Sequence, residues 1–101
     1  MPALESLILL ALLAVELFYV GYIILLTIEE IINWFGRIRN KTPNDVGFTV
    51  AEALSSGRYK VVQGVFNKGT NRVTKGRKMD VGSLDSRLRN FHRSDKVVIY
   101  E

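Results

Sequence analysis

The sequence contains no cysteine, which excludes disulfide frameworks, thiolate metal sites and thiol nucleophiles. It has one histidine, His92, and no nucleophile motif surrounds it. The glycines match neither a dinucleotide fingerprint nor a phosphate-binding loop. Clusters of Asp and Glu with metal-ligand spacing are also absent. We therefore expect neither an enzyme nor a protein with a bound cofactor or metal.

Positive charge is absent from the first third of the chain. Residues 1–35 contain four of the ten acidic residues and no Lys or Arg, whereas residues 36–101 contain all 14 basic residues and carry a net charge of +8. A chain of 101 residues is too short for two ordinary domains. The asymmetry therefore indicates a membrane-bound part followed by a basic, water-facing part that meets anions.

Residues 6–28 form an almost continuous apolar run with one acid, Glu16, near its midpoint. As a helix rising about 1.5 Å per residue, the run would span roughly 34 Å, enough for a hydrocarbon core of about 30 Å. A buried helix is disfavoured because the polar remainder is too small to wrap a helix that is apolar on every side. The run is also too long for a cleaved signal peptide. We therefore predict a transmembrane helix over residues 6–28.

An amphipathic pattern follows the run. Isoleucines and Phe35 recur at helical spacing over residues 28–38, so we expect the helix to continue to about residue 40. Because basic residues lie only after the run, we predict a single-pass membrane protein with its N-terminus outside and its C-terminus in the cytoplasm. One aromatic ring and two basic side chains suit the headgroup level and are predicted interface anchors: Trp34, Arg37 and Arg39.

The middle of the chain is interpreted as a linker, residues 41–57. Pro43 and its polar neighbours are turn formers. The segment from Thr49 to Glu52 matches a capping box, which predicts a short helix over residues 50–55.

The last part, residues 58–101, predicts a small basic cytoplasmic module of β-β-α-β type. A right-handed crossover gives a three-stranded antiparallel sheet of order 2-1-3 with one helix on a face. The predicted fold class is therefore an α+β membrane protein, with one long N-terminal transmembrane helix before this module. The expected elements are strands over 58–67 and 72–81, a helix over 84–92 and a final strand over 96–101.

Glu16 is the sharpest single feature of the apolar run. A carboxylate at the centre of a bilayer is costly and usually faces protein or water, so we expect Glu16 to contact a partner helix. Two other interpretations stay open. Glu16 could be a tolerated, protonated acid, or it could relay protons or ions.

Basic residues are concentrated after residue 57. Such a surface, held near a membrane, attracts anionic lipid or an acidic soluble protein, although a merely solvated basic face is the plainer alternative. Aromatic residues between the basic ones are few, which disfavours nucleic acid as a partner. The predicted docking surface comprises Lys75, Arg77, Lys78, Arg87 and Arg89.

These features predict an accessory, assembly or stabilising subunit of a larger membrane protein complex. Its expected partners are membrane lipids and other membrane protein subunits. One alternative is a membrane tether whose basic module recruits a soluble protein or binds anionic lipid. A further alternative is a small phage-type membrane protein.

Overall fold

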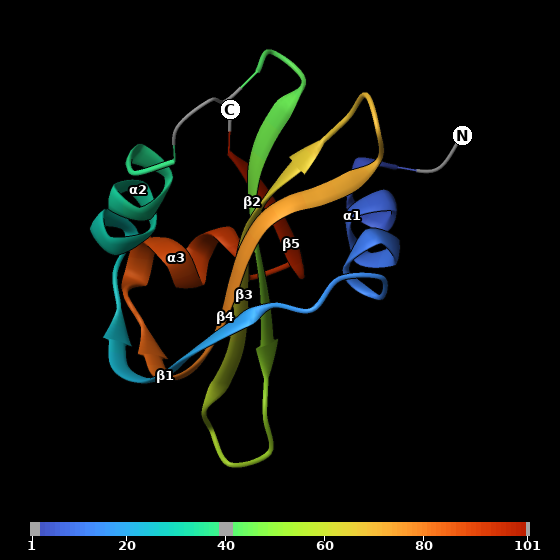
Figure 1. The fold of residues 1–101 in the computed structure, drawn as a ribbon. Helices are drawn as coiled ribbons and strands as arrows, with labels where there is room; N and C mark the ends of the chain where they lie inside the picture. The colour runs from blue at the N-terminus through green and yellow to red at the C-terminus, as the bar shows by residue number, and fades with distance from the viewer. Residues whose placement is uncertain (1–2, 39–41, 101) are drawn as a thin grey trace.

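The computed structural model describes residues 3–38 and 42–100, which form an α+β fold with three helices and a five-stranded mixed sheet (Figure 1). The sheet has the order β1-β4-β3-β2-β5. β1 runs parallel to β4, and the other neighbouring strands are antiparallel. The elements in chain order are α1 (Leu4–Leu12), β1 (Phe18–Leu26), α2 (Ile28–Gly36), β2 (Asp45–Ala53), β3 (Tyr59–Asn67), β4 (Arg72–Leu84), α3 (Ser86–Phe91) and β5 (Val97–Tyr100).

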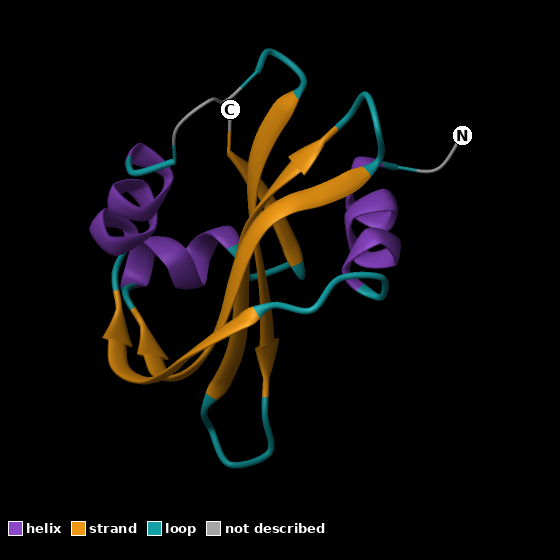
Figure 2. Cartoon of the chain, in the orientation of Figure 1, coloured by secondary structure: helices purple, strands orange, loops and turns teal. Residues whose placement is uncertain are grey.

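Helices lie on both faces of the sheet. α2 and α3 cover one face, and α1 covers the other (Figures 1 and 2). The core under α2 and α3 contains Ile31 and Leu88 packed on Met79 and Val81. The core under α1 contains Ile8 packed with Phe48 and other buried residues of the sheet. Each face of the sheet is therefore closed by a helix, but neither helix layer extends over the whole of β1 (Figure 1).

The predicted transmembrane helix over residues 6–28 is wrong. The run divides into α1, a connection over residues 13–17, and β1. Its first half is rich in Leu and Ala, which favour helix, whereas Phe18, Tyr19, Val20 and the residues after them favour strand. Within the described residues, no helix has the length and apolar character needed to cross a membrane. The predicted single-pass topology, with an outer N-terminus and a cytoplasmic C-terminus, is wrong for the same reason.

The predicted helix over residues 50–55 is also wrong, because residues 50–53 belong to β2 and residues 54 and 55 follow it without helical structure. Val46, Phe48 and Val50 are buried at every second position, which is the period of a strand. The predicted sheet order is therefore wrong as well. β2 lies between β3 and β5, and β1 adds a strand beyond β4.

The second half of the chain has strands at 59–67, 72–84 and 97–100, close to the ranges in which the sequence predicts strands. The turn between β3 and β4 is closed by Asn67, whose side-chain oxygen accepts hydrogen bonds from the backbone N–H groups of Gly69 and Thr70. Asn71 follows with a φ of 55°, a conformation that Asn tolerates better than most residues.

A buried polar side chain fixes α2 against the sheet. Gln63 of β3 is fully buried, and its Nε2 donates to the carbonyl oxygen of Ile31 at 2.9 Å. Its Oε1 accepts from Nε and Nη2 of Arg77 at 3.0 and 2.7 Å. The Arg77 guanidinium also lies over the Trp34 ring, 5.3 Å from its centroid. These contacts satisfy a group whose burial alone would be costly.

Candidate interaction surface

β1 is an edge strand whose outer side has no neighbouring strand among the described residues. Two hydrogen bonds show which backbone groups face the sheet. Ser83 Oγ donates to the carbonyl oxygen of Ile24 at 3.3 Å, and the N–H of Asp85 donates to the carbonyl oxygen of Leu26 at 2.9 Å. Successive residues of a strand direct their backbone groups to opposite sides. The N–H and C=O groups of residues 23 and 25 therefore point away from the sheet and can pair with another strand.

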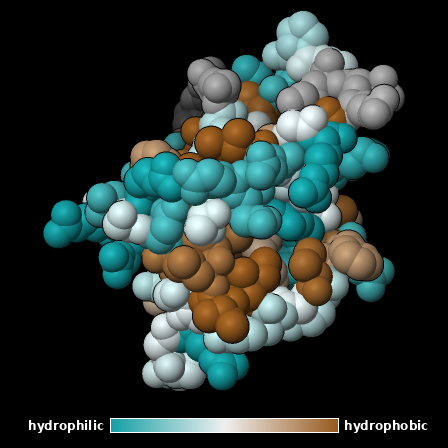
Figure 3. All heavy atoms as spheres, turned by 90° about the vertical axis from the view of Figure 1, so that its left-hand side faces the viewer, coloured by the Kyte–Doolittle hydropathy of each residue, from teal (hydrophilic) through white to brown (hydrophobic). Residues whose placement is uncertain are grey.

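The side chains of β1 are apolar and largely exposed. Phe18 is 75 % exposed and Ile24 is 76 % exposed. Tyr19, Val20, Tyr22 and Leu25 are each at least two-fifths exposed. Apolar side chains gather in the lower half of the left-hand face of the molecule, below a band of hydrophilic ones (Figure 3). A contiguous apolar surface of this kind marks an interaction site more often than an ordinary surface.

β1 has few of the devices that usually prevent edge strands from pairing. It contains no charged residue and no proline over its nine residues. Its one interruption is a register shift between Tyr19 and Gly21, where Gly21 has a φ of 119°. The segment from Tyr22 to Leu26 follows this irregularity and stays in regular contact with β4. It is therefore the part of the edge best suited to accept another strand.

Polar contacts hold the N-terminal half of β1 to its neighbours. The Tyr19 hydroxyl donates to Oδ2 of Asp80 at 2.6 Å, and this hydrogen bond raises the pKa of Tyr19. The guanidinium of Arg58 lies 4.9 Å from the centroid of the Tyr22 ring. A Cβ at Gly82 would meet both the Tyr22 hydroxyl and the backbone of β1. Glycine at this position therefore allows the close approach of β1 and β4.

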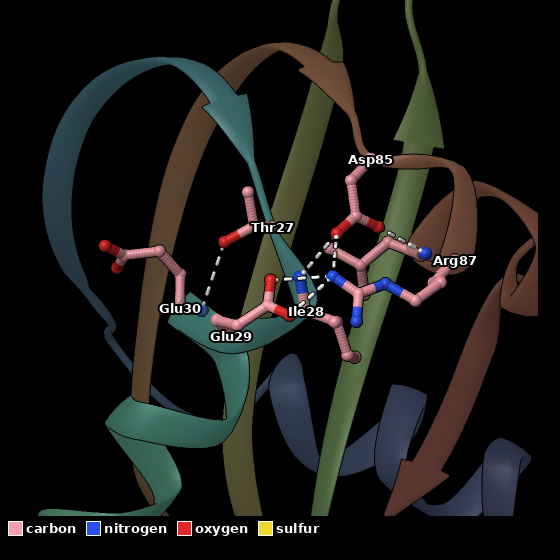
Figure 4. Close-up of polar contacts among 7 residues, drawn as sticks. Thr27, Ile28, Glu29, Glu30, Asp85 and Arg87 are labelled. Carbon is pink, nitrogen blue, oxygen red and sulfur yellow. Dashed lines mark hydrogen bonds and ion pairs between the residues drawn. The ribbon is translucent and has the colours of Figure 1, made fainter.

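The C-terminal end of β1 is fixed by one carboxylate, that of Asp85 (Figure 4). Its Oδ1 accepts from the N–H of Leu88 at 2.8 Å and caps α3, while its Oδ2 accepts from the N–H of Ile28 at 2.9 Å in the first turn of α2. Arg87 reaches the Glu29 carboxylate at 2.6 Å and Asp85 at 3.2 Å. Desolvation raises the pKa of Asp85, but the two backbone hydrogen bonds and Arg87 outweigh it and leave the pKa lowered.

A second cap lies beside this carboxylate. Thr27, the residue between β1 and α2, accepts a hydrogen bond at its Oγ1 from the N–H of Glu30 at 3.2 Å (Figure 4). The change from strand to helix is therefore sharp. Glu29 and Glu30 lie in the first turn of α2, where the helix dipole favours negative charge.

Glu16, the predicted partner-helix contact, lies in the exposed connection between α1 and β1. It lines an open hollow of about 500 Å³ that Lys60 and Lys78 also line. The predicted burial of this carboxylate in a bilayer is wrong because α1 ends at Leu12, four residues before Glu16. Whether Glu16 contacts a partner stays a prediction.

The predicted interface anchors lie at α2. Trp34 is half-buried and packs against Arg77 and edge-on against Phe35. Arg37 is exposed directly after the helix. The third, Arg39, lies outside the described residues.

The predicted basic docking surface is dispersed. Arg77 points to the face under α2, whereas Lys78 lies on the opposite face beside the connection between α1 and β1. Arg87 pairs with acids at α3, and both Lys75 and Arg89 are exposed. The structure therefore does not bring all five residues to one surface.

Sequence reasoning missed a buried hydrogen-bond chain at Thr49. His92 Nδ1 donates to the carbonyl oxygen of Asp95 at 3.0 Å, so Nε2 of the neutral ring accepts from Thr49 Oγ1 at 2.8 Å. The Tyr100 hydroxyl then donates to Thr49 Oγ1 at 2.8 Å. Thr49 is 1 % exposed, so its hydroxyl cannot reach a substrate, and the chain joins β2, β5 and the end of α3.

Burial changes the pKa of two members of this chain. It lowers the pKa of His92, although the carbonyl of Asp95 partly offsets the effect, and it raises the pKa of Tyr100.

No group of three or more potential metal ligands occurs among the described residues. No family model, curated protein or solved structure matches this chain.

Proposed function

We propose that this protein is a protein-interaction module that binds an extended segment of its partner by strand addition at β1. The observation that carries the proposal is an edge strand of nine uncharged residues with six exposed apolar side chains and a free row of backbone groups. Main-chain hydrogen bonds would supply affinity, and the exposed side chains on both sides of β1 would supply selectivity.

This proposal retains the interaction role expected from the sequence and assigns it to a different part of the molecule. The surface that meets the partner is β1, not Glu16 or the dispersed basic residues. Asp85 and Gly82 support the role, because they hold the strand against β4 while its outer side stays open. A partner strand therefore meets a preorganised edge, which lowers the entropic cost of binding.

The test uses two fluorescent peptides of the same length as β1. One alternates Val and Thr. The other has a proline at its centre, which removes a backbone donor and disfavours pairing. We expect the first peptide to bind with at least tenfold higher affinity in a fluorescence anisotropy titration.

The matched variants are Ile24→Lys, on the free edge, and Leu10→Lys, on α1. Both positions are exposed and apolar, at 76 % and 65 %. We expect Ile24→Lys to abolish peptide binding and Leu10→Lys to preserve it. Equal binding of the two peptides, or no binding of either to the monomeric chain, would contradict strand addition.

A further inference from the structure

We infer that the strand added to β1 is the β1 strand of a second copy of this chain, antiparallel about a two-fold axis at Ile24. The inference rests on the proposed function and names its partner. The result is a continuous sheet through two copies, in which the β1 edge of one chain pairs with the β1 edge of the other. A two-fold interface of this type requires one patch that is complementary to itself.

The residues of β1 meet that requirement. The strand reads Phe-Tyr-Val-Gly-Tyr-Ile-Ile-Leu-Leu, so pairing it with itself places no like charges opposite one another. Aromatic and β-branched side chains are the types that stabilise each other across strands. A charged partner strand would instead face an edge that offers it no opposite charge.

The backbone fixes the register. Residues 23 and 25 direct their backbone groups outward, as the hydrogen bonds of Ile24 and Leu26 to the rest of the sheet require. Antiparallel pairing about Ile24 places residue 23 of one copy opposite residue 25 of the other, which gives a hydrogen-bonded pair on each side of the axis. Ile24 then faces Ile24 of the second copy as a non-hydrogen-bonded pair, with Cα atoms about 4.5 Å apart.

The exposed area of the paired segment sets the strength of the dimer. Pairing about Ile24 covers residues 22–26, whose three exposed side chains, Tyr22, Ile24 and Leu25, leave on the order of 250–450 Å² at roughly 150–250 Å² each when fully exposed. A stable interface buries about 600–1,000 Å² per partner. The paired segment offers less than this, so we expect a weak dimer whose formation depends on protein concentration.

Sedimentation velocity of the full chain over a range of concentrations tests the inference. We expect a monomer–dimer equilibrium that saturates at two copies. Ile24→Lys should weaken dimerisation at least tenfold, and Leu10→Lys should not change it. Circular dichroism of each variant establishes that it is folded.

Single cysteines locate the axis, because the chain has none of its own. Only a residue on a two-fold axis lies opposite itself, and each step along the strand separates the two Cα atoms by roughly 6.6 Å more. A disulfide needs Cα atoms about 4.4–6.8 Å apart. Oxidation should therefore cross-link Ile24→Cys but neither Phe18→Cys nor Tyr22→Cys. Cross-linking at all three positions or at none would overturn the inference.

Two outcomes separate this inference from the proposed function. A chain that stays monomeric but binds the alternating peptide keeps strand addition and excludes the second copy as its partner. A chain that stays monomeric, ignores the peptide and co-sediments with phosphatidylserine vesicles in an Ile24-dependent manner overturns both, in favour of a lipid surface.

Discussion

At the scale of single residues, Asp85 joins two helices through one carboxylate. Its carboxylate caps α3 and also accepts from the first turn of α2. Losing a cap costs about 0.5–2 kcal/mol per helix, so we expect Asp85→Ala to lower the free energy of unfolding by about 2–3 kcal/mol. Urea denaturation at neutral pH measures this change. Asp95→Ala is the matched control, because the Asp95 side chain is exposed and caps neither helix; an equal loss in both variants would contradict the capping role.

His92 predicts a pH dependence of stability in a range where carboxylates do not titrate. Burial lowers its pKa in the folded state, so below about pH 6.5 the unfolded chain binds more protons than the folded one. Stability should therefore fall as the pH decreases from about 7.5 to 5.5. Urea denaturation at both pH values should give this difference for the original chain but not for His92→Gln. The lowered pKa values of the Asp85 and Glu29 carboxyls reduce stability only below about pH 5.

Individual residues also show where a local pattern misleads. Thr49 and Glu52 have the spacing of a capping box, yet Thr49 is buried in β2 and bonds to His92. The competing signal was the alternation of apolar residues from Val46 to Val50, which predicts a strand. Tertiary packing against α1 makes this second pattern decisive, and a capping box alone carries no information about such packing.

At the scale of elements, the apolar run shows the limit of hydropathy. Both a transmembrane helix and a short helix followed by an edge strand have long apolar stretches. The shift from Leu and Ala before residue 15 to aromatic and β-branched residues from Phe18 onward was visible in the sequence. Hydropathy alone gives this shift no weight, because a small polar remainder is not expected to support so much apolar surface. The structure supports it by leaving much of β1 exposed.

The elements of the β3–β4 hairpin were easier to predict, because their signals are local. Asn67 to Asn71 has the composition of a turn, and the strands before and after it are rich in residues that favour strands. β1 pairs with β4 through contacts between residues as distant as Phe18 and Arg77. No local pattern encodes such a pairing, so the free edge that forms the candidate interaction surface could not be predicted.

Close packing between strands gives a prediction at two glycines. A Cβ at Gly64 of β3 would lie 2.7 Å from both the Lys75 carbonyl oxygen and the Phe48 ring, whereas a Cβ at Gly36 would meet nothing within 4 Å. Gly64→Ala should therefore destabilise the fold by about 1–3 kcal/mol. Gly36→Ala, at the end of α2, should be neutral or slightly stabilising. Thermal denaturation of both variants decides the point; similar melting temperatures would contradict the predicted steric conflict.

At the scale of the whole molecule, the sheet order predicts how protection from hydrogen exchange is distributed. β3 has a strand on each side and is largely buried, so its amides should exchange most slowly. The amides of residues 23 and 25 point outward from β1 and should exchange fastest among strand amides at low protein concentration. Mass spectrometry at low and high concentration should show protection of β1 increasing as copies pair. Concentration-independent exchange at β1 would count against self-pairing.

The parallel pairing of β1 with β4 also has a consequence for protein synthesis. The last residue of β1, Leu26, is made 46 residues before the first residue of β4, Arg72. At roughly 5–20 residues per second, the apolar N-terminal stretch waits about 2–10 s on the ribosome before its neighbour in the sheet exists. During that interval the aromatic and aliphatic side chains of β1 have no β4 to pack against, so this edge of the sheet is completed only after β4 has been made.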